Sequence, residues 1–181
     1  MKKRNNFKIF FFALFLIYIL ILVDGSISFI AHFFSALVAG KIFWLGSLCV
    51  LTVLSFEINV NFLGVAVVSG IIADIFYSGI IGIYTVSFAI TAIFLKWIVQ
   101  YLPHNFIYII SSYFLSVTIF STIYYGINNY LGLTRTAPFQ YLATYLPATL
   151  LFNLFYFIIL YVPMLKIIEN FKRKMALKDE K

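Results

Sequence analysis

Apolar runs follow one another along almost the whole chain and leave no polar face between them. A helix or strand at the surface of a soluble protein is apolar on one side only, because its other side meets water. Apolar residues make up 64% of this chain and charged residues only 10%, whereas soluble domains average about 45–50% and about 25%. With a mean hydropathy of +1.04, the chain is predicted to be an integral membrane protein whose solvent is lipid.

Breaks between the runs predict where the helices begin and end. A bilayer core of about 30 Å needs about 20 apolar residues at 1.5 Å per residue, and we expect an all-α polytopic bundle of about six transmembrane helices. The chain has room for a single membrane domain, residues 1–181. The expected spans are 7–23, 42–56, 62–77, 83–99, 106–125 and 141–165.

Two details of this layout follow from local sequence. Residues 27–39 form a run that is too short to cross the bilayer, so we expect them to lie along its outer interface. Glu57, Asn59 and Asn61 are expected to turn the chain on the cytoplasmic side. Pro147 and Pro163 fall within the sixth span, where each removes a backbone hydrogen bond and is predicted to bend the helix.

Basic residues gather at the ends of the apolar runs and predict the orientation. Lys and Arg collect in cytoplasmic loops, so basic segments at both ends of the chain require an even number of crossings. Six crossings satisfy this condition and place both termini in the cytoplasm at the plasma membrane, with only Lys41 and Arg135 outside. The cytoplasmic cations are Lys2, Lys3, Arg4, Lys8, Lys96, Lys166, Lys172, Arg173, Lys174, Lys178 and Lys181. The net charge of +7 is therefore assigned to membrane anchoring and not to a nucleic-acid surface.

Residues that usually carry chemistry are scarce and scattered. The single Cys49 excludes a disulfide framework and a CxxC metal site. His32 and His104 lie far apart, and neither has an acid or a cysteine at ligand spacing. The chain has no HExxH zinc pair, no GxSxG elbow and no paired carboxylates, so we expect no catalytic residue, no metal, no cofactor and no enzymatic activity.

The most specified stretch runs from Gly70 to Tyr84, where the third and fourth spans meet. An aspartate at a helix centre costs about 2.5–3.5 kcal/mol on insertion, so Asp74 is expected to face protein or water. Small residues at three- and four-residue spacing share its helix face and favour close backbone packing; they are Ala66, Gly70 and Ala73. Gly79 and Gly82 supply the turn into the fourth span.

Two interpretations of Asp74 remain open. It is either a structural carboxylate hydrogen-bonded to a neighbouring helix or a coupling residue for a proton or ion. We favour the structural interpretation, because a transporter of protons or ions would more readily show several embedded acids, whereas Asp24 and Glu57 are expected at span ends.

The stretch Gly-Ile-Ile-Ala-Asp followed by Phe-Tyr-Ser-Gly-Ile-Ile-Gly-Ile-Tyr resembles the glycine–aspartate signature of the rod shape-determining protein MreD family. The length, the basic start, a first span ending in Val23-Asp24-Gly25 and the short basic tail resemble its Gram-positive members. The family pattern maps onto five positions, which we take as structural or interaction residues. They are Gly70, Asp74, Gly79, Gly82 and Tyr84.

The resemblance implies a non-enzymatic component of the bacterial cell-elongation machinery for peptidoglycan synthesis. Its implied partners are an MreC-like protein and, with it, MreB where present, RodA and a class B penicillin-binding protein. The family fold is also similar to the substrate-binding subunits of energy-coupling-factor vitamin transporters, which supplies an alternative function: a membrane subunit that binds a vitamin or other small molecule. Asn128, Asn129, Arg135 and Gln140 are the outer-loop residues suited to part of that binding.

Overall fold

The computed structural model describes residues 2–34, 45–57 and 62–179, and these residues form a helical bundle. π-helical turns continue α3 and join α6 to α7, so the described chain makes six helical rods. The elements are α1 (Lys2–Phe34), α2 (Gly46–Glu57), α3 (Phe62–Ala73), η1 (Asp74–Ser78), α4 (Ile83–Val99), α5 (Phe106–Tyr130), α6 (Pro138–Gln140), η2 (Tyr141–Tyr145) and α7 (Leu146–Asp179). The expectation of an all-α bundle is confirmed for these residues.

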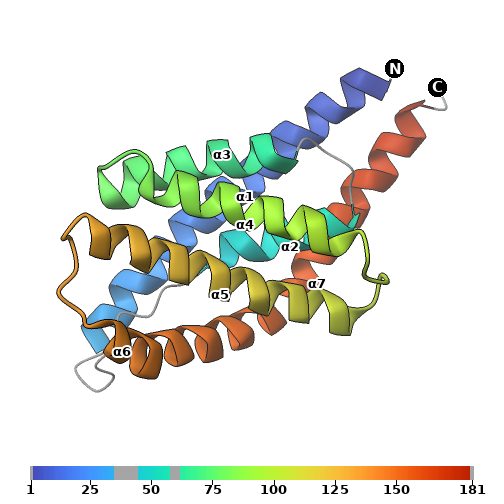
Figure 1. The fold of residues 1–181 in the computed structure, drawn as a ribbon. Helices are drawn as coiled ribbons and strands as arrows, with labels where there is room; N and C mark the ends of the chain where they lie inside the picture. Colours follow the sequence, from blue (N-terminus) through green and yellow to red (C-terminus); the bar gives the residue numbers. More distant parts are fainter. Residues whose placement is uncertain (1, 35–44, 58–61, 180–181) are drawn as a thin grey trace.

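The two ends of the bundle carry different connections (Figure 1). The N and C termini lie at the same end as the 100–105 connection between α4 and α5. The 79–82 turn and the 131–137 loop lie at the opposite end. Helices α3 and α4 lie side by side as an antiparallel hairpin, and α4 packs in turn against α5.

Helix α2 is the innermost element. Every residue from Leu45 to Leu54 is buried, and α1, α4, α5 and α7 all pack against this helix. A helix that is buried on every side needs no polar face, which explains the apolar sequence of α2. The hydroxyl of Thr52 within it donates to the carbonyl of Leu48 in the same helix (2.8 Å). With 12 residues, α2 is about 18 Å long, shorter than the full crossing expected over 42–56. Residues 42–44 of that range, and the expected turn residues Asn59 and Asn61, lie outside the described residues.

The helix end expected after Val23 is absent. Helix α1 continues without a break to Phe34, so the first part of the 27–39 segment belongs to the same helix, and residues 35–39 lie outside the described chain. Gly25 lies inside this helix, where its missing side chain leaves room for Tyr77: a Cβ at Gly25 would lie 2.8 Å from the Tyr77 ring. The Tyr77 hydroxyl donates to the carbonyl of Ile21 at this crossing.

The remaining boundaries match the expected spans closely in the middle of the chain and less well toward its end. The fourth span, 83–99, coincides with α4, and 62–77 corresponds to α3 with η1. Helix α5 ends at Tyr130 and not at the expected residue 125. The last helical rod begins before residue 141 and ends after residue 165. The π-helical turn η2 ends at Tyr145, two residues before Pro147. Pro147 cannot donate a backbone hydrogen bond, and such a turn accommodates the missing bond.

Three helices among the described residues are long and apolar enough to cross a membrane. They are Lys8–Ile27, Phe106–Tyr130 and Pro138–Phe171. Shorter apolar helices accompany them, over Gly46–Phe56, Phe62–Ser78 and Ile83–Val99.

Candidate functional site

The carboxylate of Asp74 caps the first turn of α4. The Asp74 side chain is fully buried. Its Oδ1 accepts the backbone N–H of Tyr84 (2.7 Å), and its Oδ2 accepts those of Gly82 (2.8 Å) and Thr85 (3.1 Å). The hydroxyls of Thr85 (2.6 Å) and Ser78 (3.1 Å) complete the shell. The first N–H groups of a helix lack partners within the helix, and this carboxylate supplies them.

The turn between Asp74 and α4 depends on two glycines with positive φ. Gly79 has φ 65° and donates its backbone N–H to the carbonyl of Asp74 (2.8 Å), which ends η1. Gly82 has φ 124°, a conformation that L-residues with a Cβ rarely adopt. The two glycines reverse the chain within four residues and bring the α4 N-terminus back over Asp74.

Gly70 allows the two arms of this hairpin to touch. A Cβ at Gly70 would lie 2.4 Å from Thr85 Cα and 2.9 Å from Thr85 N, so the backbones of α3 and α4 are in direct contact there. The small residues predicted to share its face, Ala66 and Ala73, are buried as well. This close approach places the Asp74 carboxylate within reach of the α4 backbone.

Tyr84 packs the α3–α4 hairpin against α5. Its ring is buried and lies 4.9 Å from the ring of Tyr124 and 6.0 Å from that of Phe120, both on α5. The structure therefore brings Gly70, Asp74, Gly82 and Tyr84 together around one helix turn. Gly79 joins them through its backbone alone: its N–H donates to the carbonyl of Asp74, and a Cβ there would meet no atom within 4 Å, as at Gly82.

A second buried carboxylate, Asp24 on α1, caps α2 in the same manner. Asp24 is only 4% exposed. Its Oδ1 accepts the N–H of Gly46 (3.1 Å) and the hydroxyl of Tyr156 (3.1 Å), and its Oδ2 accepts the N–H of Ser47 (3.2 Å). Sequence reasoning placed Asp24 at the end of a span and missed this role. The sequence feature that could have identified Asp24 is the one that identified Asp74, an acid inside an apolar run.

Asn153 completes the cap of α2 from the other side. Its Oδ1 accepts the N–H of Leu45 (2.8 Å) and the hydroxyl of Tyr113 (3.3 Å), and its Nδ2 donates to Thr149 O (2.8 Å). The start of α2 is thus bonded to side chains from α1, α5 and α7. Asn153 also interrupts an apolar run, but sequence reasoning did not single it out.

Helix N-termini attract anions because their free N–H groups and the helix dipole both favour negative charge. In this chain the N-termini of α2 and α4 are occupied by the chain's own carboxylates, from Asp24 and Asp74. Each carboxylate is surrounded by hydrogen-bond donors from neighbouring elements. Such an arrangement fixes helices relative to one another.

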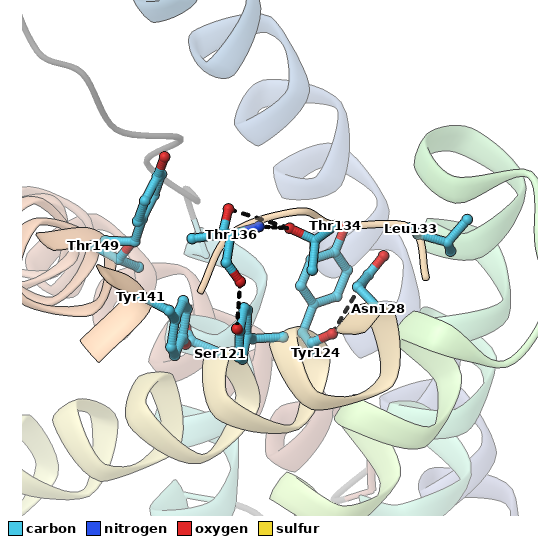
Figure 2. A pocket seen from close by; sticks show the side chains of 10 residues that line it. Ser121, Tyr124, Asn128, Leu133, Thr134, Thr136, Tyr141 and Thr149 are labelled. Carbon is cyan, nitrogen blue, oxygen red and sulfur yellow. Dashed lines mark hydrogen bonds between the residues drawn. The ribbon is translucent and has the colours of Figure 1, made fainter. Parts of the chain in front are cut away.

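A pocket of about 230 Å³ lies where α5, the 131–137 loop and the start of the last helical rod meet. Figure 2 shows the loop passing over side chains of α5. All but two of its 10 lining side chains bear a hydroxyl, and the exceptions are Asn128 and Leu133. Of the four outer-loop residues suggested by the sequence, Asn128 lines this pocket, whereas Asn129, Arg135 and Gln140 are exposed and outside its lining.

No protein-family model, curated protein or solved structure matches this chain. What bears on its function is therefore the geometry of the two capped helices and of the pocket, together with the apolar helices that carry them.

Proposed function

We propose that the chain is a polytopic protein of the bacterial plasma membrane with six crossings and both termini in the cytoplasm. The two ends of the bundle support this topology. Both termini, with their lysines and arginines, share an end with the last turn of α4, which contains Lys96. The opposite end contains the 131–137 loop with Arg135. The short α2 is compatible with a bilayer because it is enclosed by protein on all sides.

Within that membrane we propose a non-enzymatic role in the cell-elongation complex, as in the MreD family that the Gly70–Tyr84 stretch resembles. The observation that carries the proposal is the closed hydrogen-bond shell of Asp74. The carboxylate is used within its own hairpin, as a structural element requires. The role is that of a rigid scaffold and not of a proton relay or a catalytic site.

The hairpin also offers a surface for a protein partner. Around its turn the apolar side chains of Ile75, Ile80 and Ile81 are exposed, Ile81 by 73%. They lie at the end of the bundle opposite the termini, which the proposed topology places at the outer face. We propose that an MreC-like protein binds there and links the chain to RodA, a class B penicillin-binding protein and, where present, MreB.

Crosslinking in cells tests the partner. A photoreactive amino acid at Ile81 is expected to capture an MreC-like protein, whereas one at Ile93, 57% exposed on α4, is expected to capture lipid or nothing. Asp74→Asn and Gly70→Leu are expected to weaken co-purification and to make rod or ovoid cells rounder or wider. Gly126→Leu is the matched control, since a Cβ there meets open space.

A folding defect would complicate those two variants, so Ile81→Ser is the second test. It changes an exposed side chain and leaves the hairpin hydrogen bonds intact. Normal cell shape and normal co-purification in Ile81→Ser, Asp74→Asn and Gly70→Leu together would refute the proposed interaction.

The topology is tested separately by labelling single cysteines. In a Cys49→Ala background, a membrane-impermeant maleimide is expected to label Ile81→Cys from outside the cell and Tyr101→Cys only after the membrane is opened. Tyr101 is 70% exposed at the 100–105 connection. Labelling of both positions from outside would contradict the six-span topology.

A second candidate function is a substrate-binding subunit of a small-molecule transporter, and the pocket beneath the 131–137 loop favours it. This function predicts an ATPase module that co-purifies with the chain, together with a small molecule that mass spectrometry detects in the purified protein. Capture of the MreC-like protein without such a module would decide for the scaffold.

A further inference from the structure

Contacts within the protein hold together the loop and the two helical segments that form the pocket beneath residues 131–137. The hydroxyl of Tyr125 donates to the carbonyl of Thr136 (2.7 Å) and ties the loop to α5. The rings of Tyr125 and Tyr141 stack at 4.0 Å with an interplanar angle of 7°, which joins α5 to η2. A pocket with fixed walls costs a ligand little ordering entropy.

Two polar atoms of the pocket lining have no hydrogen-bond partner among the described residues, the Oγ of Ser121 and the hydroxyl oxygen of Tyr141. Ser121 on α5 is 5% exposed and lines the pocket, and its Oγ has no hydrogen-bond partner among the described residues. Many serines and threonines in these helices donate to the carbonyl four residues earlier, as Ser116 does to Ser112 O (2.7 Å). Buried polar groups are nearly always paired, and in the wall of this pocket the hydroxyls of Ser121 and Tyr141 each have a hydrogen bond left to form.

The lining determines which chemistry fits. No described residue that lines the pocket is charged, so an ionic ligand would lose its hydration without gaining a counter-charge. Leu133 is the single aliphatic residue of the lining, and four tyrosine side chains supply aromatic surface beside it. Hydroxyl groups both donate and accept hydrogen bonds, and Tyr124 and Tyr145 add aromatic surface beside them.

We propose that this pocket binds a small, uncharged, polyhydroxylated molecule of the size of one sugar ring. Each hydroxyl of such a molecule is donor and acceptor at once and matches a lining of the same kind. The volume of about 230 Å³ is below the roughly 300–1,000 Å³ of pockets that hold drug-sized ligands, which fits one ring and excludes a longer oligosaccharide. The proposal depends on these lining residues and not on either proposed function.

Binding is tested on the full chain, purified in a zwitterionic detergent without a sugar head group, because alkyl glycosides would compete. The probes are glucose, N-acetylglucosamine and myo-inositol, with hexanol and lactate as apolar and anionic comparisons. Saturation-transfer NMR is expected to detect at least one of the three hydroxylated rings, and millimolar concentrations of that ring are expected to raise the unfolding temperature. Hexanol and lactate are expected to do neither.

Two variants locate the binding in the pocket. Ser121→Ala is expected to weaken the binding of the hydroxylated ring about tenfold, the effect of losing one buried hydrogen bond. Thr134→Trp places a large ring at the loop and is expected to abolish binding while helicity by circular dichroism stays the same. The matched control is Ser112→Ala, because Ser112 Oγ is also buried without a partner on α5 but lies outside the pocket lining. That control is expected to bind as the unaltered chain does.

The proposal is overturned if none of the three rings binds, if hexanol or lactate binds as well as they do, or if Ser121→Ala and Thr134→Trp bind like the Ser112→Ala control. None of these results would alter crosslinking at Ile81, so failure of the pocket proposal is distinguishable from failure of the proposed function.

Discussion

The carboxylate of Asp74 lies 2.8 Å from the backbone N of Gly82, across a turn that Gly82 itself makes possible with φ 124°. The acid and the glycine therefore work as a pair: one closes the helix N-terminus, and the other brings that N-terminus within reach. Asp24 and Gly46 repeat the relationship at α2 (3.1 Å), where a Cβ on Gly46 would lie 2.8 Å from Asp24 Oδ1. Among the described helices, α2 and α4 each begin against a buried carboxylate.

Replacing Asp74 by Asn is expected to lower the free energy of unfolding by about 1–3 kcal/mol, because an amide has one acceptor oxygen and leaves buried N–H groups of α4 unpaired. Equilibrium unfolding in mixed micelles, followed by circular dichroism, measures the loss. Ser78→Ala removes only one donor from the same carboxylate and is the milder comparison. Equal stability of Asp74→Asn and the unaltered chain would contradict the cap.

Gly70→Ala is expected to destabilise the chain by about 1–3 kcal/mol through overpacking, because the new Cβ would lie 2.4 Å from Thr85 Cα, a backbone atom that cannot move aside alone. Gly126→Ala is the control, since its Cβ meets no atom within 4 Å. Alanine there is expected to be neutral or to stabilise α5 by up to about 1 kcal/mol. Thermal unfolding of the two purified variants distinguishes them, and similar values for both would argue against close contact of α3 and α4.

At the α2 cap, Asp24→Ala is expected to cost more stability than Tyr156→Phe. The first change leaves the N–H groups of Gly46 and Ser47 buried without the carboxylate, whereas the second removes a single hydroxyl donor worth about 1 kcal/mol. Urea or dodecyl sulfate titration of both proteins gives the order. A reversed order would show that Asp24 is not the main cap of α2.

The two turn glycines are expected to differ in how well they tolerate replacement by asparagine. Gly79 adopts the ordinary left-handed conformation (φ 65°, ψ 0°), which Asn tolerates, so Gly79→Asn should fold with little loss. Gly82→Asn should lose about 1–3 kcal/mol, because φ 124° with ψ −27° is accessible chiefly to glycine. The yield of monodisperse protein and its unfolding temperature report the difference, and equal tolerance of both substitutions would contradict the turn geometry.

The sequence predicted the α3–α4 hairpin well because every signal there is local. Small residues at helical spacing, an acid in an apolar run and two nearby glycines lie within about twenty residues of one another. The length of α1 and the enclosure of α2 were not predictable in the same way. Gly25 was predicted to end the first helix, but it lies within that helix and makes room for the ring of Tyr77. A local sequence pattern does not predict a contact between residues so far apart in the chain.

The sequence by itself determined that the described part of the chain is an apolar helical bundle and where its hairpin turns. It also determined that Asp74 had to be paired, since an unpaired buried acid is too costly to retain. Only the tertiary structure decided what pairs with what. Asp24 and Asn153 meet at the start of α2 although they are distant in sequence. Ser121 lines a pocket only because the 131–137 loop and the last helical rod pack beside α5. The physical reason is that apolar periodicity and insertion cost are properties of single segments, whereas hydrogen-bond partners and cavities depend on how several segments pack together.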